Sequence, residues 1–314
     1  MIKTPSASHF STVLEMGMKG WIIDGIAKES ASSILLKNSR VYIATRRQHY
    51  FNPKRLLDFY RLQNSNDLLF MHFRPFFRFC ESISARNVRV FITHLDSERS
   101  LGSKEVAMLN RAQRLIFQNR TVLDFAVSKG VSSSICLVGH GAVSERDFYP
   151  SENIPSSRYV LISGECKPRK NPKLVEEVIL DNPDLHFVIH GRGWEEFFKN
   201  NKPSNLDLLP FDKIRHPDLM RNASLSLSLS KNEGGPFPLL EALASGTPVV
   251  CSRTGFATEV VSNESGVVLS AEPTLKEIKS AMRKMIFLKQ EVYNQNLLPP
   301  GHDWKSFAQT LYML

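Results

Sequence analysis

The sequence holds few cysteines and none of the spacings that give cysteines a shared structural role. There are four, and they occur singly, with no C-x-x-C pair and no pair of histidines at zinc-finger distance. A disulfide framework and a zinc finger are therefore excluded, and the pattern is typical of reduced thiols in the cytosol. The four residues are Cys80, Cys136, Cys166 and Cys251.

Long apolar runs are missing as well. The opening residues, MIKTPSASHFSTVLEMGMKGW, contain no apolar stretch of roughly 7 to 15 residues like that of a signal peptide. Nowhere do about 20 apolar residues follow one another, as a membrane-spanning helix requires. We therefore expect a cytoplasmic protein, soluble or at most peripheral on the inner face of a membrane.

Acidic residues are scarce in the first half of the chain. Residues 1–150 hold 21 Lys and Arg against 12 Asp and Glu, whereas residues 151–314 hold 19 Lys and Arg against 19 Asp and Glu. The whole formal net charge of +9 therefore belongs to the first half. This asymmetry indicates an anionic partner for that half, such as a membrane surface, a phosphorylated acceptor or nucleic acid.

Short β-branched or aromatic runs alternate with helical patterns along the chain, which is typical of βαβ units and a parallel sheet. A Pro- and Ser-rich segment at residues 145–157 predicts a linker. We therefore predict an α/β fold of two Rossmann-like parallel-sheet domains facing a central cleft, at residues 1–150 and 158–300, with a final helix at residues 301–314. The predicted strands are Phe10 to Leu14, Arg40 to Ala44, Asp67 to His72, Val88 to His94, Arg114 to Gln118, Ile135 to Gly139, Tyr159 to Ser163, His186 to His190, Asp207 to Leu209, Leu225 to Ser230 and Pro248 to Cys251.

The segment most informative about chemistry runs from Ser228 to Val250, SLSKNEGGPFPLLEALASGTPVV, and predicts a strand, a Gly-rich turn and a helix. The backbone amides of Gly234 and Gly235 would lie at the helix N-terminus, where free N–H groups and the helix dipole stabilise phosphate oxygens. Glu233 and Glu241 are eight residues apart and can reach different hydroxyls of one extended ligand. The alternative is a surface turn with two solvated glutamates.

The run EGGPFPLLEALASGTPVV closely resembles the Glu-x7-Glu signature of retaining glycosyltransferases of the GT-B fold, glycosyltransferase family 4 (group 1). The resemblance implies that Glu233 contacts the hydroxyls of the donor sugar and that Glu241 contacts the ribose of a sugar nucleotide. It covers residues 159–310 well and residues 1–150 loosely. By the same resemblance, the diphosphate lies against the backbone of Gly234, Gly235, Pro236 and Phe237.

A second match lies upstream, in YVLISGECKPRKN. In the family, a strand ends in Gly-Arg and a lysine follows five residues later, and the two cations bracket the diphosphate. Lys170 fits the lysine, but Glu165 occupies the arginine position. A carboxylate beside a diphosphate is repulsive, so either Glu165 points away or Lys167 or Arg169 supplies the missing charge.

The first half carries weaker signals. By resemblance, His94 at the carboxyl end of RVFITHLD lies near the transferred sugar, and His72, which closes LLFMH, is a similar candidate. Gly17 and Gly20 resemble a shortened form of the family's first Gly-rich loop, which approaches the donor phosphate or the acceptor. The alternatives are structural histidines and the first turn of a helix. Because its first strand is short, this domain is expected to be abbreviated.

Three further features fill in the outline. HGRGW, from His190 to Trp194, matches a family Gly-x-Gly, although it lacks the third glycine of a dinucleotide fingerprint. Leu209 to Phe211 stands where family members wall the nucleobase, although such an apolar group is more often core. Trp304 matches a Trp that opens the last helix, which crosses back onto the first domain.

Glycosyl transfer needs positive charge near the diphosphate leaving group. The chain has no Asp-x-Asp motif, so we expect no metal and no other cofactor, and Lys170 with the helix N-terminus would act in its place. The resemblance implies hexosyl transfer with retention of configuration, by front-face attack in which the leaving phosphate accepts the proton of the acceptor.

Three functions stay open. The first is extension of a cell-envelope glycan or lipid-linked acceptor held by the basic domain, whose basic and aromatic residues around Arg46 and Arg47 and in RPFFRF would contact an anionic membrane. The second is the same chemistry on modified DNA bases, although nucleic acid is not the partner we expect. The third is a non-catalytic sugar-nucleotide-binding module, with Glu165 as the sign of lost activity. The sequence does not name the sugar or choose between UDP and GDP.

Overall fold

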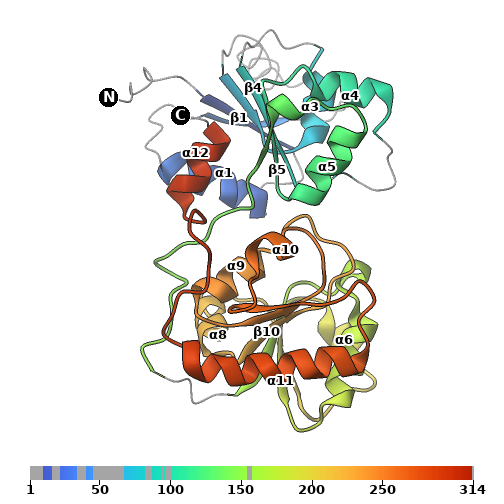
Figure 1. Ribbon diagram of the computed structural model, residues 1–314, viewed down its shortest axis with the longest axis vertical. Helices are drawn as coiled ribbons and strands as arrows, with labels where there is room; N and C mark the ends of the chain where they lie inside the picture. The colour runs from blue at the N-terminus through green and yellow to red at the C-terminus, as the bar shows by residue number, and fades with distance from the viewer. Residues whose placement is uncertain are drawn as a thin grey trace. The chain divides into compact units, whose positions relative to one another are not determined.

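The computed structural model describes residues 10–15, 22–33, 40–44, 67–81, 87–93, 95, 101–153 and 158–312. The chain divides into two compact units, one made of Met1–Gly141 with Trp304–Leu314 and the other of Ala142–Asp303 (Figure 1). Each unit has a six-stranded sheet, and every strand pair described in it is parallel. The predicted α/β fold with two parallel-sheet units is confirmed.

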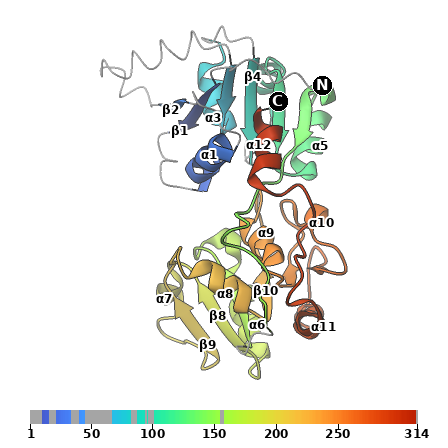
Figure 2. The ribbon, with the colours of Figure 1, turned by 90° about the vertical axis from the view of Figure 1, so that its left-hand side faces the viewer.

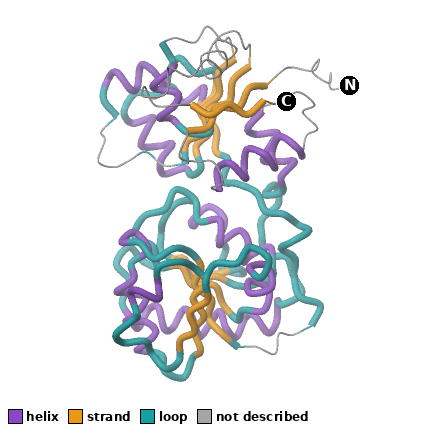
Figure 3. Tube along the Cα trace, turned by 180° about the vertical axis from the view of Figure 1, so that it is seen from behind, coloured by secondary structure: helices purple, strands orange, loops and turns teal. Residues whose placement is uncertain are grey.

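The first sheet has the strand order β2-β1-β3-β4-β5-β6. Its central strands are buried because helices cover both faces (Figure 3). The sequence predicts an abbreviated first unit, but the described sheet of this unit has as many strands as the second sheet. In chain order the elements are β1 (Phe10–Glu15), α1 (Ile22–Ser33), β2 (Arg40–Ala44), β3 (Asp67–Phe70), α3 (Phe73–Phe79), β4 (Asn87–Ile92), α4 (Ser103–Leu109), β5 (Arg114–Phe117), α5 (Arg120–Ser128) and β6 (Cys136–Val138).

Helix α12 (Trp304–Tyr312) completes the first unit from the far end of the chain. The Phe307 ring lies 5.8 Å from the Phe91 ring of β4, centroid to centroid, and Ser33 at the end of α1 donates a hydrogen bond of 3.1 Å to the Trp304 carbonyl. The buried residues of α12 itself are Phe307, Ala308, Leu311 and Tyr312. The first unit is therefore discontinuous in sequence.

The second sheet has the order β12-β11-β10-β7-β8-β9. Figure 2 shows the same ribbon turned, with α8 beside β8 and β9. Its elements are β7 (Tyr159–Ser163), α6 (Pro172–Asp181), β8 (His186–His190), α7 (Trp194–Phe197), β9 (Leu206–Leu209), α8 (His216–Asn222), β10 (Leu225–Ser228), α9 (Phe237–Ala244), β11 (Val249–Cys251), α10 (Ala257–Val260), β12 (Gly266–Val268) and α11 (Leu275–Val292).

The side chains of strand β7 pack into two hydrophobic layers, one on each face of the sheet. Successive side chains of a strand point to opposite faces. Val160 and Ile162 join the layer that contains residues of α6 and α11, whereas Tyr159 and Leu161 join the layer that contains residues of α8, α9 and α10. The alternation buries both faces of the sheet and leaves its carboxyl edge for polar residues.

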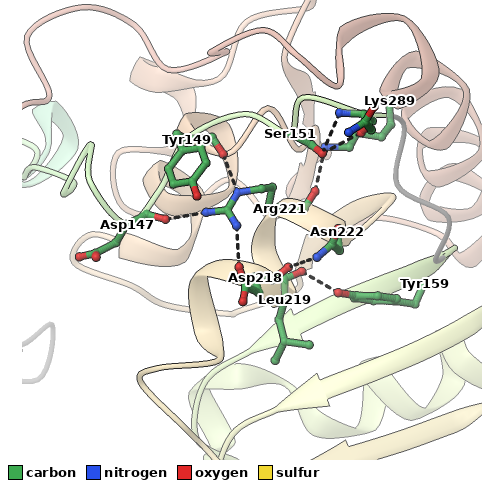
Figure 4. Close-up of polar contacts among 10 residues, drawn as sticks. Asp147, Tyr149, Ser151, Tyr159, Asp218, Leu219, Arg221, Asn222 and Lys289 are labelled. Carbon is green, nitrogen blue, oxygen red and sulfur yellow. Dashed lines mark hydrogen bonds and ion pairs between the residues drawn. The ribbon is translucent and has the colours of Figure 1, made fainter.

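The predicted linker at residues 145–157 is wrong for its described part, which belongs to the second unit. Arg221 of α8 holds it: its side chain donates hydrogen bonds of 3.1 Å to the Tyr149 carbonyl and 2.9 Å to the Asp147 carbonyl (Figure 4). The guanidinium carbon also lies 3.8 Å from the centre of the Tyr149 ring, and Asp218 neutralises its charge at 2.5 Å. The N-terminal segment of the first unit therefore ends at Gly141 rather than at residue 150.

Four elements of the second unit were not predicted: α7, β12, α10 and α11. β12 and α10 are too short to give a periodic pattern. Helix α11 did carry a signal, because Thr274 and Glu277 have the spacing of a capping box, and the Thr274 hydroxyl accepts a hydrogen bond of 3.2 Å from the Glu277 amide. Among the helices of the described residues, none combines the length and the apolar character needed to cross a membrane.

Candidate functional site

The Glu233 carboxylate lies between two cations at the carboxyl edge of the second sheet. Glu233 belongs to the loop after β10, and the 3₁₀ turn Pro168–Lys170 after β7 brings Arg169 and Lys170 to it. Lys170 Nζ lies 2.6 Å from Glu233 Oε1, and Arg169 Nη1 pairs with Glu233 Oε2. A backbone hydrogen bond of 2.7 Å from the Lys231 amide to the Arg169 carbonyl joins the two loops. The structure thus brings together three predicted site residues.

The electrostatics of this group favour an ionised Glu233. Its side chain is only 8% exposed, and burial by itself raises its pKa. The opposing effects of Lys170, Arg169 and the Ser230 hydroxyl, which donates a hydrogen bond of 2.9 Å, lower the pKa below its ordinary value. Two cations share one carboxylate, so the group carries a local excess of positive charge.

Glu165, the departure from the family pattern, does not face this group. Its carboxylate pairs with Lys167 Nζ at 2.8 Å, and both side chains are largely exposed. Of the two cations offered as substitutes, Lys167 is therefore occupied by Glu165, whereas Arg169 contacts Glu233. Arg169 is therefore the second cation beside Glu233, at a different position of the loop from the family arginine.

Two glycines set the path of this loop. Gly164, directly after β7, has a φ of +126°, which L side chains rarely adopt, and a Cβ there would lie 3.1 Å from Lys170 Cε. A Cβ at Gly191, after β8, would lie 1.9 Å from the Gly164 carbonyl oxygen. The same oxygen accepts a hydrogen bond of 2.8 Å from the Trp194 indole. The HGRGW segment therefore holds the Lys170 loop in place.

Glu241, the second carboxylate of the motif, has different neighbours. It lies on α9, and its Oε2 is 2.9 Å from Nε2 of His216, the first residue of α8. His216 Nδ1 lies 3.0 Å from Nδ1 of His190, the last residue of β8. The backbone amide of Asp212 donates a hydrogen bond of 2.9 Å to His190 Nε2. Both histidines are buried, at 1% and 7% exposed for His190 and His216.

The pKa of His190 is lowered, first by burial and then by His216 and Arg215, although Asp212 opposes the shift. His190 is therefore neutral near pH 7. Phe211 lies against it, with ring centroids 5.1 Å apart, and is 47% exposed. Phe211 is thus not a core residue, and it remains available as the nucleobase wall that the resemblance implies.

The start of α9 differs in detail from the predicted phosphate cradle. The helix begins at Phe237, and Pro236 at its N-cap is buried. The Phe237 amide donates a hydrogen bond of 3.0 Å to the Gly235 carbonyl, and Pro238 has no N–H to offer. On the backbone, the groups expected to face a diphosphate are therefore those of Gly234 and Gly235. The side chains of Lys170 and Arg169 would add the positive charge.

Several predicted residues of the first unit lie outside the described residues. They are His94, Gly17 and Gly20, together with Arg46 and Arg47 of the basic stretch. His72 is described, and its Nδ1 accepts a hydrogen bond of 3.1 Å from the Arg74 amide as the N-cap of α3. A capping role for His72 follows from this geometry.

Sequence reasoning missed His190, His216 and Ser230. His190 ends a predicted strand next to HGRGW, so the strand-end rule that selected His94 would also have selected it. His216 and Ser230 gave no signal in the sequence. The contact of His216 with Glu241 depends on the packing of α8 against α9. The contact of Ser230 with Glu233 depends on the path of the loop after β10.

Residues 144–297 match the family model of the glycosyl transferases group 1. The solved structures most similar in fold include Anabaena HepE in complex with UDP and glucose, with a TM-score of 0.73 and 13% identity over 96% of this chain and 95% of that chain. Sucrose-phosphate synthase from Thermosynechococcus elongatus has a TM-score of 0.71 and 12% identity, over 97% and 95% of the two chains. No curated protein sequence matches this chain.

A third structure, that of WaaG, a glycosyltransferase involved in lipopolysaccharide biosynthesis, has a TM-score of 0.62 and 16% identity over 97% of both chains. The two parallel-sheet units and these likenesses define the GT-B fold, which this chain shares with the solved structures. The match to the glycosyl transferases of group 1 covers residues 144–297, just under half of the chain, and lies within the second unit.

Proposed function

We propose that the protein transfers a hexosyl group, with retention of configuration and as in family 4, from a nucleoside diphosphate sugar to a hydroxyl of a cell-envelope glycan or lipid-linked acceptor. The observation that carries the proposal is the buried Glu233 carboxylate held by Lys170 and Arg169 inside the segment that matches the family. HepE, similar in fold, was solved with UDP-glucose, which supports a sugar nucleotide as the donor.

In the proposed reaction, the bond between the anomeric carbon and the diphosphate oxygen breaks, and the electron pair leaves with the diphosphate. The acceptor oxygen bonds to the anomeric carbon on the same face, and its proton passes to the leaving phosphate oxygen. Lys170 Nζ and the Arg169 guanidinium stabilise the charge that develops on the diphosphate, and Glu233 orients the sugar through its hydroxyls. Glu241 accepts a hydrogen bond from the ribose.

We also propose that the reaction needs no metal, because the local excess of positive charge around Glu233 can perform the same electrostatic role. Transfer should then persist in excess EDTA at an unchanged rate. A rate restored only by Mg²⁺ or Mn²⁺ would contradict this part of the proposal.

The acceptor is assigned to the basic first unit, and we propose peripheral contact of that unit with an anionic membrane. The double change Arg46→Glu with Arg47→Glu should weaken sedimentation with phosphatidylglycerol vesicles and leave nucleotide affinity intact. Equal loss of both properties would contradict this division of labour. Binding to duplex DNA that falls linearly with log salt, without vesicle binding, would instead favour action on modified DNA bases.

The alternative function, a non-catalytic module that binds a sugar nucleotide, is less well supported by the residues of the site. It depended on Glu165 facing the diphosphate, and Glu165 pairs with Lys167 instead. Nucleotide binding without transfer, and without even slow donor hydrolysis, would favour such a module.

The first experiment is a thermal-shift screen of UDP, GDP and ADP and their sugars. A ligand at 100 times its dissociation constant stabilises the folded state by about 2.7 kcal/mol, which is readily measured. Donors that bind are then tested for hydrolysis and transfer. If none of the nucleoside diphosphates binds, the proposed function is wrong.

A further inference from the structure

The hydrogen-bonded histidines behind Glu241 admit only one arrangement of protons. A backbone amide can only donate, so His190 Nε2 must accept from Asp212. The ring proton of a neutral His190 then lies on Nδ1 and is donated to His216 Nδ1. His216 in turn carries its proton on Nε2 and donates it to Glu241 Oε2. The chain of donors therefore runs in one direction, from the Asp212 amide to the carboxylate.

Charged forms of the histidines break this chain. A protonated His190 has no lone pair to accept from the Asp212 amide. A protonated His216 would place a second proton between the two Nδ1 atoms, which lie 3.0 Å apart. All three hydrogen bonds exist together only when both rings are neutral. The charged groups that influence His190 are Asp212 and Arg215, and Glu241 faces His216 from α9.

We propose that His190 and His216 are positioning residues that hold the Glu241 carboxylate for a ribose hydroxyl of the nucleotide, through a hydrogen-bond relay anchored on the Asp212 amide. The inference rests on the proposed function, since Glu241 must face the donor. The Glu241 side chain is about one-fifth exposed and bonds to His216 through Oε2 alone, which leaves Oε1 for the ligand. Fixing the side chain before binding removes an entropic cost that the ligand would otherwise meet.

The relay also reaches the predicted nucleobase wall. Phe211 packs against His190 and lies 5.7 Å from the His216 ring, centroid to centroid. One buried pair therefore supports both the aromatic side chain expected beside the base and the carboxylate expected beside the ribose. We expect changes in the pair to alter nucleoside affinity and to leave the chemical step largely unaffected.

Two substitutions of His216 separate the relay from general packing. In His216→Gln the amide nitrogen can take the place of Nε2 and donate to Glu241, whereas in His216→Asn the side chain extends only as far as Nδ1. Titration with UDP, GDP and ADP identifies the nucleoside diphosphate that binds the wild-type protein most tightly, and that compound is the probe. We expect His216→Asn to weaken its binding about tenfold and His216→Gln by less than about threefold, with kcat at saturating donor changed little in either.

A double-mutant cycle tests whether His216 acts through Glu241. If it does, His216→Asn added to Glu241→Ala, which offers His216 no side-chain acceptor, causes no further loss of affinity. A purely structural role would give additive losses and would lower the melting temperature of His216→Asn and His216→Gln equally. Additive losses, or equal affinity losses in the two variants, would overturn the relay.

A pH titration without any histidine variant covers the case in which the His216 variants do not fold. Binding of the probe should weaken more steeply at acidic pH in the wild type than in Glu241→Ala, because the protonation of the ligand itself is common to both. Identical pH profiles would overturn the relay while leaving nucleotide binding intact. Absence of binding to any of the three diphosphates in the wild type would instead overturn the proposed function.

Discussion

The two carboxylates of the Glu-x7-Glu motif lie at the same edge of one sheet, yet their surroundings differ in kind. Glu233 is ion-paired with Lys170 and Arg169, whereas Glu241 accepts a hydrogen bond from a buried histidine. Sequence spacing treats the two as equivalent. The structure separates them into a charged group, suited to a diphosphate and a breaking bond, and an uncharged relay, suited to orienting a hydroxyl.

This difference predicts which kinetic parameter each residue controls. An interaction realised in the transition state lowers kcat when it is lost, whereas one that is equal in ground and transition states affects binding alone. We therefore expect the Glu233 group to act mainly on kcat and the Glu241 group mainly on donor affinity.

The largest effect is expected for Glu233→Gln. The amide keeps the shape of the side chain but cannot pair with both cations, so kcat should fall by about 10²–10³-fold with little change in melting temperature. Steady-state transfer with a validated donor measures this. Glu165→Gln is the matched control and should keep nearly full activity, because Glu165 pairs with the exposed Lys167 rather than with the Glu233 group. Equal losses in the two variants would show that Glu233 has been misassigned.

The next effect separates the two cations. Lys170 is 13% exposed and Arg169 is 48% exposed, so water screens Arg169 more. Lys170→Met should lower kcat/KM by about 10²-fold and Arg169→Met by about tenfold. Lys167→Met is the control on the same loop. If Lys167→Met proved the most damaging of the three, the replacement of the family arginine by Arg169 would be refuted.

A smaller effect is expected for Glu241→Gln. The variant keeps an oxygen that can accept from His216 but loses the negative charge, so the Kd for the nucleoside diphosphate should rise about tenfold while kcat changes little. Calorimetric titration gives the Kd, and turnover at saturating donor gives kcat. A fall in kcat as large as that of Glu233→Gln would erase the distinction between the two carboxylates.

The smallest effect concerns acid stability. The pKa of His190 is lowered in the folded state, so the unfolded chain binds more protons near pH 6 and stability falls as the pH drops through about 6.5. The pKa of Glu233 is also lowered, so its contribution is lost only at a pH below the ordinary value for a glutamate. The His190 slope is at most about 1.4 kcal/mol per pH unit and should vanish in His190→Gln, as measured by chemical denaturation from pH 8 to 5.

Regular local patterns made much of the fold predictable. The bounds of β2, β7 and β8 agree with the prediction, since β-branched and aromatic runs end sharply at polar or glycine residues. The linker was misplaced because composition alone does not reveal that Arg221 captures the carbonyls of Asp147 and Tyr149.

The site was predictable in its residue types and not in its pairings. Glu233, Lys170 and Glu241 stood out from motif spacing, which depends on backbone positions close in sequence. The choice of Arg169 over Lys167, and the partnership of Glu241 with His216, depend on where separate loops and helices meet. Such contacts follow from tertiary packing, which a single sequence does not encode in any local pattern.

The discontinuity of the first unit sets an order of events during translation. The ribosome releases the entire second unit, Ala142–Asp303, before it makes α12. Until then, Phe91 of β4 lacks the aromatic ring of Phe307 that packs against it in the finished protein. The unit that is synthesised first is therefore the last to complete its core, and the growing chain carries an exposed apolar surface until its final helix has left the ribosome.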